Sequence, residues 1–521
     1  MKKFDRRLPI ERRTLLKGGV VLGAGLVTGP MLSGHAMAGE PGLLRFGLSS
    51  YPPSLDPWAN AGTAAATVKL QIHRGLLSYD DKADLRPELA ESWEAENGST
   101  YVFKLRQNAT FHDGTPVTSA DVKASYEAIM AEDSTAYLRS AFGIIDSIET
   151  PDDHTVRIHL GQDSAPFIYL TASFMAHVIP AGSIGGDRED VIGCGPYRIA
   201  SVERGTRIDM EAYDGFYKDG LPKSQKLSFI AYKDENLRVA ALEAGDVDII
   251  EYVPWQSMDF IAQNDNLVLD NTDGPFMYLV FNTTEGPLAD PRVRDAIGYA
   301  IKREDVMAAA FFGRGNPLNG MPIPASSPFF NEEYANHWSY DPERAKQLLA
   351  EAGYADGFDC TFLSTAQYGM HKDTAEVCQQ HLAAVGIRAK LNLPDWATRV
   401  DLGNQGQYDI AVMGTAGDFN DPDALANFVD GRRGPSFVRS HNFNDDKINE
   451  LIDAGQRELD EGKRKEIYDQ WQARCVELVP IVGINWRAQG YAFQKNVQGF
   501  TNIPGFLTFY SGAIIETAEN T

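Results

Sequence analysis

The chain has 521 residues and a formal net charge of −24, with 48 basic and 72 acidic side chains. Hydrophobic residues make up 43% of it and charged residues 23%, which excludes a wholly disordered or fibrous chain. This length favours two or three domains. The acidic balance argues against a nucleic-acid binder and against docking on an anionic membrane surface, because both need a basic face. Four cysteines are too few for a disulfide scaffold.

The first forty residues have the order of an export signal. Basic residues gather in 1–17, and an apolar, glycine-rich run follows from Gly18 to Leu32. Small residues then predict cleavage between Ala38 and Gly39. Arg12-Arg13 resembles the motif of the twin-arginine export machinery, and an ordinary secretory signal with a chance arginine pair is the alternative. We therefore expect residues 1–38 to be a twin-arginine-type signal peptide.

The rest of the chain has no second run of ~18 apolar residues, the length that a membrane span needs. We expect a soluble protein, exported to the periplasm and monomeric there.

Two strands with alternating apolar residues are predicted at 101–106 and 155–160. No crossover helix follows either, so this region is predicted to be mainly antiparallel. Further along, helices are expected to start at Asp290-Pro291 and Asp341-Pro342, with Gly353 ending the second. Strands at 358–363, 387–393 and 408–413, with a helix at 374–385, then indicate a partly parallel α/β sheet.

Familiar catalytic and metal-binding motifs are missing from the sequence. His112 follows a strand in a turn-forming segment and is interpreted as a turn residue rather than a metal ligand. The four cysteines show no C-x-x-C spacing, so no metal site and no cofactor is expected. A Cys360–Cys378 disulfide and buried free thiols both remain open.

The segment from Asp418 to Asp423 is the most acidic compact motif. It can be a solvated turn in which Asp421 and Asp423 cap the next helix. A calcium loop is a weaker interpretation, since the spacing does not fit the twelve-residue pattern. Alternatively, Asp418 points into a cleft beyond the end of a strand, where a carboxylate would suit a ligand ammonium group.

Several motifs in order carry a resemblance to a known family. They are Ser54-Leu55-Asp56-Pro57, Pro87-Glu88-Leu89-Ala90-Glu91-Ser92-Trp93, Phe111-His112-Asp113-Gly114-Thr115-Pro116, Gly193-Cys194-Gly195-Pro196-Tyr197 and Val293-Arg294-Asp295-Ala296-Ile297. Over residues 43–515 the chain resembles the family 5 (cluster C) periplasmic solute-binding proteins of ABC importers, the peptide-, dipeptide- and nickel-binding receptors. Cys194 departs from the family pattern.

The resemblance implies an α/β, periplasmic binding protein type II-like, two-lobe fold with an extra, mostly antiparallel subdomain in the first lobe. Crossovers between the lobes are expected near 270–280 and 485–492. The expected bounds are 39–84, 186–272 and 490–521 for lobe I, 85–185 for its extra subdomain, and 273–489 for lobe II.

The resemblance also implies where a ligand binds. Asp418 matches the aspartate that receives the α-ammonium group in peptide-binding members, and Trp396 matches a cleft-lining tryptophan. The remaining candidates are Ala61, Gly62, Thr63, Tyr278 and Thr415. Tyr278 could equally be packed core.

The chain departs from the oligopeptide receptors at Val412 and Thr415, where those members carry an arginine and a tryptophan. Candidate replacements for the carboxylate-binding arginine are Arg399, Arg432 and Arg433, although solvated surface explains each of them as well.

The resemblance therefore implies a non-enzymatic receptor that captures a small solute and delivers it to ABC permease subunits. A peptide or dipeptide is the first expectation for the solute, and an opine, oligosaccharide, nickel chelate or haem is the alternative. A second hypothesis is an exported hydrolase that uses Asp418 and Asp421 as a carboxylate pair.

Overall fold

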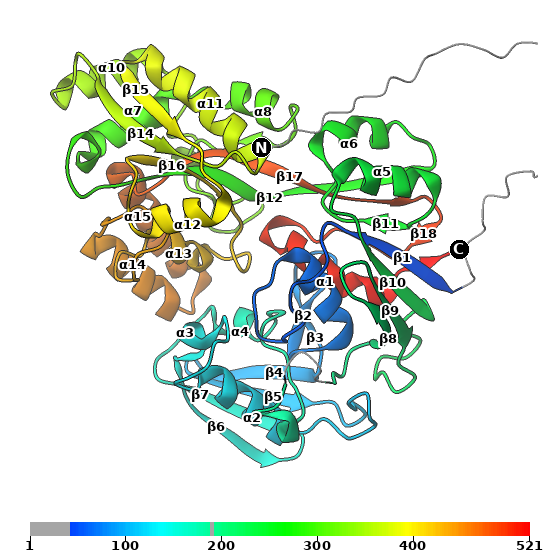
Figure 1. Ribbon diagram of the computed structural model, residues 1–521. Coiled ribbons are helices and arrows are strands. Elements are labelled where there is room, and N and C mark those ends of the chain that lie inside the picture. The colour runs from blue at the N-terminus through cyan, green and yellow to red at the C-terminus, as the bar shows by residue number, and fades with distance from the viewer. Residues whose placement is uncertain (1–41, 188–191) are drawn as a thin grey trace, which may run out of the picture. The chain divides into compact units, whose positions relative to one another are not determined.

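The computed structural model describes residues 42–187 and 192–521 (Figure 1). The expected signal peptide, 1–38, and its cleavage position at Ala38 and Gly39 lie outside the described residues. Among the residues that are described, none of the helices has the length and apolarity to cross a membrane.

A mixed sheet of eleven strands organises most of the described chain. Its order is β15-β14-β16-β12-β17-β11-β1-β10-β9-β8, and β13 pairs with β17. The strands are β1 (Leu43–Leu48), β8 (Tyr197–Glu203), β9 (Arg207–Ala212), β10 (Lys226–Ala231), β11 (Ile249–Ile250), β12 (Leu267–Phe281), β13 (Asn316–Pro317), β14 (Phe358–Leu363), β15 (Ile387–Asn392), β16 (Ile410–Thr415) and β17 (Val482–Gln494).

The two long strands β12 and β17 join the two ends of this sheet (Figure 1). They pair antiparallel from Leu267 opposite Gln494 to Leu279 opposite Val482. At one end β17 pairs with β11, and at the other end β12 pairs with β16. Both strands lie where the sequence predicts the crossovers, 270–280 and 485–492. They connect the strands β14, β15 and β16 at one end of the sheet with β1 and β8 to β11 at the other.

A separate four-stranded antiparallel sheet confirms the prediction for the region after residue 85. Its order is β4-β5-β7-β6, with β4 (Ala90–Asn97), β5 (Thr100–Leu105), β6 (Ile145–Asp152) and β7 (Thr155–Leu160). Alternate residues of β5 and β7, such as Phe103 and Ile158, are fully buried. The same alternation in the sequence predicted these strands because successive side chains of a strand point to opposite faces.

The partly parallel sheet predicted near residue 360 is present. β14 pairs in parallel with both β15 and β16. Helices α7 (Pro291–Ala300) and α10 (Pro342–Glu351) start as predicted, with the carboxylates of Asp290 and Asp341 accepting hydrogen bonds from backbone N–H groups of the first turn at 2.9 Å. Gly353 follows α10 with φ at +90°, a conformation that favours glycine.

Several boundaries differ by a residue or more from the prediction, and two of these differences bear on the site. Helix α11 (Gly369–Ala384) begins five residues before Thr374, since burial of His371 outweighs the poor helix propensity of Gly369. Strand β16 runs to Thr415 rather than Met413, because Gly414 and Thr415 still pair with β12. These extensions bring both segments to the cavities described below.

The described residues also form short strands and further helices. They are β2 (Leu77–Tyr79), β3 (Leu85–Pro87), β18 (Val497–Gln498), β19 (Glu519–Asn520), α1 (Thr63–Ile72), α2 (Ser119–Met130), α3 (Arg139–Phe142), α4 (Phe167–Leu170), α5 (Glu235–Ala244), α6 (Trp255–Ala262), α8 (Arg303–Ala310), α9 (Glu332–Ala335), α12 (Trp396–Asn404), α13 (Ala426–Val429), α14 (Asp446–Arg457), α15 (Glu461–Leu478) and the 3₁₀ segments η1 (Ala181–Ser183), η3 (Pro287–Ala289), η4 (Pro422–Leu425) and η5 (Gly505–Thr517).

Candidate functional site

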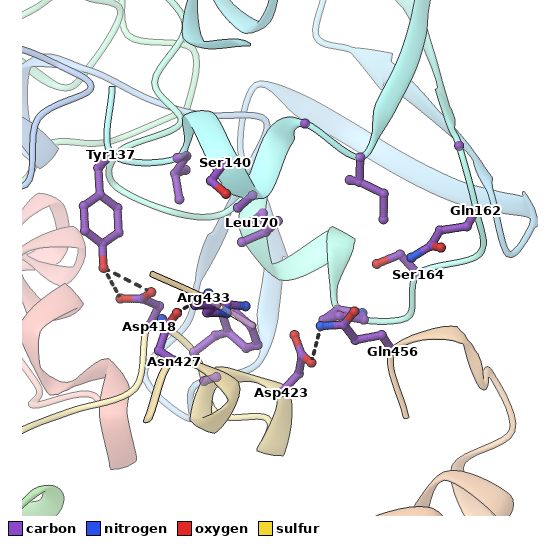
Figure 2. Close-up of a pocket in the computed structure, with 18 residues that line it drawn as sticks. Tyr137, Ser140, Gln162, Ser164, Leu170, Asp418, Asp423, Asn427, Arg433 and Gln456 are labelled. Carbon is purple, nitrogen blue, oxygen red and sulfur yellow. Dashed lines mark hydrogen bonds between the residues drawn. The ribbon is translucent and has the colours of Figure 1, made fainter. Parts of the chain in front are cut away.

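Asp418 lies on the loop between β16 and η4, just beyond the end of its strand. Its half-buried carboxylate accepts two long hydrogen bonds, both 3.4 Å, from the hydroxyl of Tyr137. Figure 2 shows Tyr137 pointing at this carboxylate from a different segment of the fold. Burial raises the pKa of Asp418, while the Tyr137 hydrogen bond and the charge of Arg433 oppose that rise. Asp418 thus retains hydrogen-bond acceptor capacity.

A first cavity, of about 740 Å³, lies between the segment 137–170 and the segment 418–456 (Figure 2). Asp418 and Arg433 line one part of it. Asp423 lines another part and accepts a 2.7 Å hydrogen bond from the amide of Gln456. Burial and the neighbouring charge of Asp421 raise the pKa of Asp423 to about 7.

A second cavity, of about 440 Å³, brings together four of the sequence-predicted residues: Gly62, Thr63, Thr415 and Asp418. Ala61 precedes them and is half-buried, but it is not among the residues that line this cavity. Gly62 has φ at +88° directly before α1, so the chain turns sharply there and presents Thr63 as the first helical residue.

A third cavity, of about 570 Å³, is called the hinge cavity here because Arg487 and Gln489 of β17 line it. Trp396 and Thr415 also belong to its wall. It shares Thr415, Ala416 and Phe509 with the second cavity. Five of the seven predicted ligand residues therefore line the second cavity, the hinge cavity or both, and the exceptions are Ala61 and Tyr278.

Trp396 is held by the start of helix α12. Asp395 caps this helix, accepting a 3.1 Å hydrogen bond from the backbone N–H of Thr398. The indole contacts His371 edge-on, with ring centroids 5.5 Å apart. The guanidinium carbon of Arg399 lies over the indole, 5.4 Å from its centroid. These contacts fix the orientation of a large apolar surface in the cavity wall.

The three arginines considered as carboxylate partners have different places. Arg399 is fully buried between Trp396 and Phe437 and lines none of the three cavities. Arg432 forms ion pairs with Asp430 and Asp453, as a surface residue would. Arg433 lines the first and second cavities but also contacts Asp430, 3.4 Å away.

Tyr278 occupies the packed core, the alternative left open by the sequence. Its side chain is fully buried in β12 and its hydroxyl donates a 2.8 Å hydrogen bond to the carbonyl of Val438. It lines none of the three cavities.

Asp421 does not form a pair with Asp418 at one cavity. Its carboxylate binds both terminal nitrogens of Arg464, at 2.5 and 2.8 Å, and it caps η4 through the backbone N–H of Asp423. The predicted capping by Asp421 is confirmed, but the prediction of a solvated turn is wrong, because Asp421 is only 4% exposed. A carboxylate held in a buried, two-point ion pair has little capacity left to act as a base.

The remaining sequence candidates are structural. His112 lies in a turn and its Nε2 is 3.1 Å from the carbonyl oxygen of Gly195. Cys360 and Cys378, like Cys194 and Cys475, are buried free thiols, so the disulfide alternative is not formed. Across residues 42–187 and 192–521, no group of three or more His, Cys, Asp or Glu side chains could hold a metal ion.

Sequence reasoning missed Arg487, Gln489, His371 and Tyr252, all in the wall of the hinge cavity. One signal was available. Polar residues at 485, 487 and 489 alternate with apolar ones at 484, 486 and 488, so β17 carries a polar face. Because β17 also lies at a predicted crossover, the sequence indicated a hinge there rather than a ligand-binding face.

A family model for the bacterial extracellular solute-binding proteins, family 5, matches residues 84–436. The chain belongs to this family. Members of the family are solute-binding components of transport systems, and the receptor role expected for an ABC transporter is thereby confirmed.

Curated relatives and solved structures agree with this family. A glutathione-binding protein of Pectobacterium atrosepticum is 29% identical over 398 residues, 75% of each chain, and one of Escherichia coli K12 is 27% identical over 466 residues, 87% of this chain and 90% of that one.

The structure of AgaA from A. tumefacien R10, described as a complex with agropinic acid, is 43% identical. It covers 92% of this chain and 99% of its own at a TM-score of 0.82. A dipeptide-binding protein from Pseudoalteromonas sp. SM9913, in complex with Met-Leu, shares the fold at 22% identity and a TM-score of 0.76, over 92% and 100% of the two chains. The predicted type II-like, two-lobe α/β fold is thus confirmed.

Proposed function

We propose that this receptor captures an opine-like organic acid, of which agropinic acid is the first candidate, in the adjoining second and hinge cavities. The observation that carries the proposal is the 43% identity over 92% of the chain to a protein described in complex with agropinic acid. Such a receptor needs a concave, largely preformed site with aromatic walls and a few placed polar groups. Trp396, Phe509 and Asp418 supply these elements.

A dipeptide is the second candidate ligand, and the loop at Asp418 favours it. The sequence there resembles the loop that holds the α-ammonium group in peptide-binding members of the family. Among the residues that the structure describes, the Asp418 carboxylate has only the two long hydrogen bonds from Tyr137 to give up on binding an amine. We therefore keep the dipeptide as the direct competitor of the opine.

Calorimetry with agropinic acid, Met-Leu and glutathione tests this proposal. We expect reversible, stoichiometric binding of agropinic acid and a higher melting temperature in its presence. If Met-Leu binds more tightly, the dipeptide assignment replaces the opine.

Asp418→Asn should weaken binding of an amine-bearing ligand by about 2–5 kcal/mol, because a desolvated ammonium group loses its partner. Native mass spectrometry of the protein purified from its own periplasm would identify a co-purifying solute.

We propose that the protein binds its solute without chemical change. The commitment of Asp421 to Arg464 supports this, since it removes the carboxylate pair that a hydrolase would use. Recovery of chemically unchanged agropinic acid after long incubation is the expected result, and any product would contradict it.

We also propose the expected bounds: 39–84, 186–272 and 490–521 for lobe I, 85–185 for its extra subdomain, and 273–489 for lobe II. The protein is proposed to be a monomer. It is proposed to reach the periplasm through the twin-arginine pathway, with cleavage between Ala38 and Gly39. Replacing Arg12 and Arg13 together by lysine should retain the full-length chain in the cytoplasm. Fractionation followed by N-terminal sequencing checks both the route and the cleavage position.

A further inference from the structure

Arg487 is a buried cation with no carboxylate to balance it. Its side chain, on β17, is 3% exposed and lines the hinge cavity. Nη1 donates to the Sδ of Met370 at 3.3 Å, a weak acceptor, and Nε has no hydrogen-bond partner. The hydroxyl of Tyr252 is its other polar neighbour, and among residues 42–187 and 192–521 no carboxylate pairs with it.

A buried arginine in the same cavity wall, Arg238, shows how this fold can satisfy a guanidinium that serves structure. It is 2% exposed and donates to three backbone carbonyls, those of Glu251, Tyr232 and Tyr252, at 2.8 to 3.1 Å. Because desolvating an unpaired charge is costly, a cation left incomplete inside a cavity wall points to a partner that arrives from outside.

Two neutral polar groups beside Arg487 are also incomplete. The Oε1 of Gln489 and the Nδ1 of His371 lack hydrogen-bond partners, although both side chains are 2% exposed and line the same cavity. Burial, with smaller contributions from Arg399 and Arg487, lowers the pKa of His371 to about 3, so its imidazole is neutral at physiological pH. Neutral acceptors of this kind suit hydroxyl or amide N–H groups of a ligand.

The aromatic neighbours give this corner a fixed shape. Tyr252 stacks against Phe509 with ring centroids 6.2 Å apart and an interplanar angle of 16°. Tyr252 has a φ of +53°, which residues other than glycine rarely adopt, and its carbonyl accepts a hydrogen bond from Arg238. Glu235 is the carboxylate among the lining residues of the hinge cavity, and it is solvent-exposed at the start of α5.

We propose that the hinge cavity is a carboxylate subsite, in which Arg487 binds a carboxylate of the solute while Gln489 and His371 bind hydroxyl or amide groups next to it. The proposal rests on the proposed function and narrows it to small organic acids that carry such groups beside the carboxylate. It also places the carboxylate partner on the hinge strand β17 rather than on β16, the strand that carries the corresponding arginine in the oligopeptide receptors.

The test compares Arg487→Met with Lys390→Met, which removes an exposed cation of β15 that lines none of the three cavities. Methionine preserves the bulk of the arginine stem beside Met370. Calorimetry with agropinic acid measures the full ligand. Thermal shifts with glycolate and its neutral amide, glycolamide, probe the subsite alone and do not depend on the identity of the natural solute.

Glycolate should raise the melting temperature of the wild type and of Lys390→Met more than glycolamide does, and Arg487→Met should lose that difference. Arg487→Met should also weaken agropinic acid binding about 100-fold or more, with Lys390→Met near wild type. If glycolate acts as described but agropinic acid does not bind, the subsite stands and the proposed solute is wrong. If agropinic acid binds the wild type and Arg487→Met equally, the subsite is overturned and the proposed function stands. Failure of both probes on the wild type overturns both.

Discussion

Two buried charged regions of this protein differ in how their charges are balanced. In the first, Glu88 and Glu516 share three cations: Arg74 and Lys218 contact both carboxylates within 3.3 Å, and Arg86 lies 3.1 Å from Glu516. In the second, at the hinge cavity, the polar neighbours of Arg487 are the thioether of Met370 and the hydroxyl of Tyr252.

The difference separates charges that are paired within the fold from a charge that, in our proposal, is paired only when a ligand binds. Burial alone would raise the pKa of Glu516, but Lys218, Arg74 and Arg86 overcome that effect and hold the pKa far below its usual range. Burial instead lowers the pKa of Arg487, with only Tyr252 opposing it. A matched cluster stabilises the folded chain, whereas an unmatched cation lowers its stability until a partner binds.

The largest expected effect comes from breaking the matched cluster. Glu516→Gln leaves Arg74 and Lys218 with one carboxylate and should lower the free energy of unfolding by about 3–5 kcal/mol. Urea denaturation followed by circular dichroism measures it. Glu519→Gln, at an exposed position three residues away, is the control and should change little. Equal effects of the two variants would mean that the cluster does not act as a unit.

Asp423 lies between the two extremes, because an amide is its main partner. Its pKa of about 7 exceeds the unfolded value of 3.8, so its contribution to stability is complete below pH 4 and is lost as the pH rises to 7. Asp423→Asn keeps the hydrogen bond from Gln456 without the charge. It should raise the free energy of unfolding by about 2–4 kcal/mol at pH 8 and by less than half as much at pH 5, where Asp423 is still protonated in the folded chain.

Denaturation curves at the two pH values check this sign. Asp401→Asn, an exposed control on α12, should show no such dependence on pH. A stabilisation by Asp423→Asn that is equal at pH 5 and pH 8 would contradict the raised pKa.

Arg487→Met should stabilise the unliganded protein, by about 1–2 kcal/mol, because an unmatched buried charge is replaced by an apolar chain. Arg464→Met is the matched comparison. It removes a buried arginine that is paired with Asp421, and it should be destabilising. Differential scanning calorimetry of both variants without added solute gives the two signs, and a destabilised Arg487→Met would show that this cation is balanced within the fold.

The smallest effect concerns a charge at the surface. Asp341→Ala removes the cap of α10 and should cost about 1 kcal/mol of stability. Lys346→Ala, on the exposed face of the same helix, is the control. A loss from Lys346→Ala as large as that from Asp341→Ala would place the effect in the helix surface rather than in its cap.

Local patterns of the sequence predicted much of the fold. The alternation in β5 and β7 and the Asp-Pro starts of α7 and α10 depend on residues close together in the chain, so they could be recognised without the structure. The boundaries of α11 and β16 could not, because burial of His371 and pairing with β12 extend them against local propensity. Of the candidate site, Asp418, Trp396 and Thr415 were predicted through the family resemblance, while Tyr278 proved to be core.

By itself, the sequence indicated the family through its ordered motifs, and the resemblance to that family implied the two-lobe architecture and the ligand loop that carries Asp418. Tertiary structure alone decided that Asp421 pairs with Arg464 and that, within the described part of the chain, Arg487 has no carboxylate partner. Whether a buried charge has an opposite charge beside it depends on which side chains from distant segments contact it and on how much water they exclude. Neither can be derived from the residues that are neighbours in the sequence.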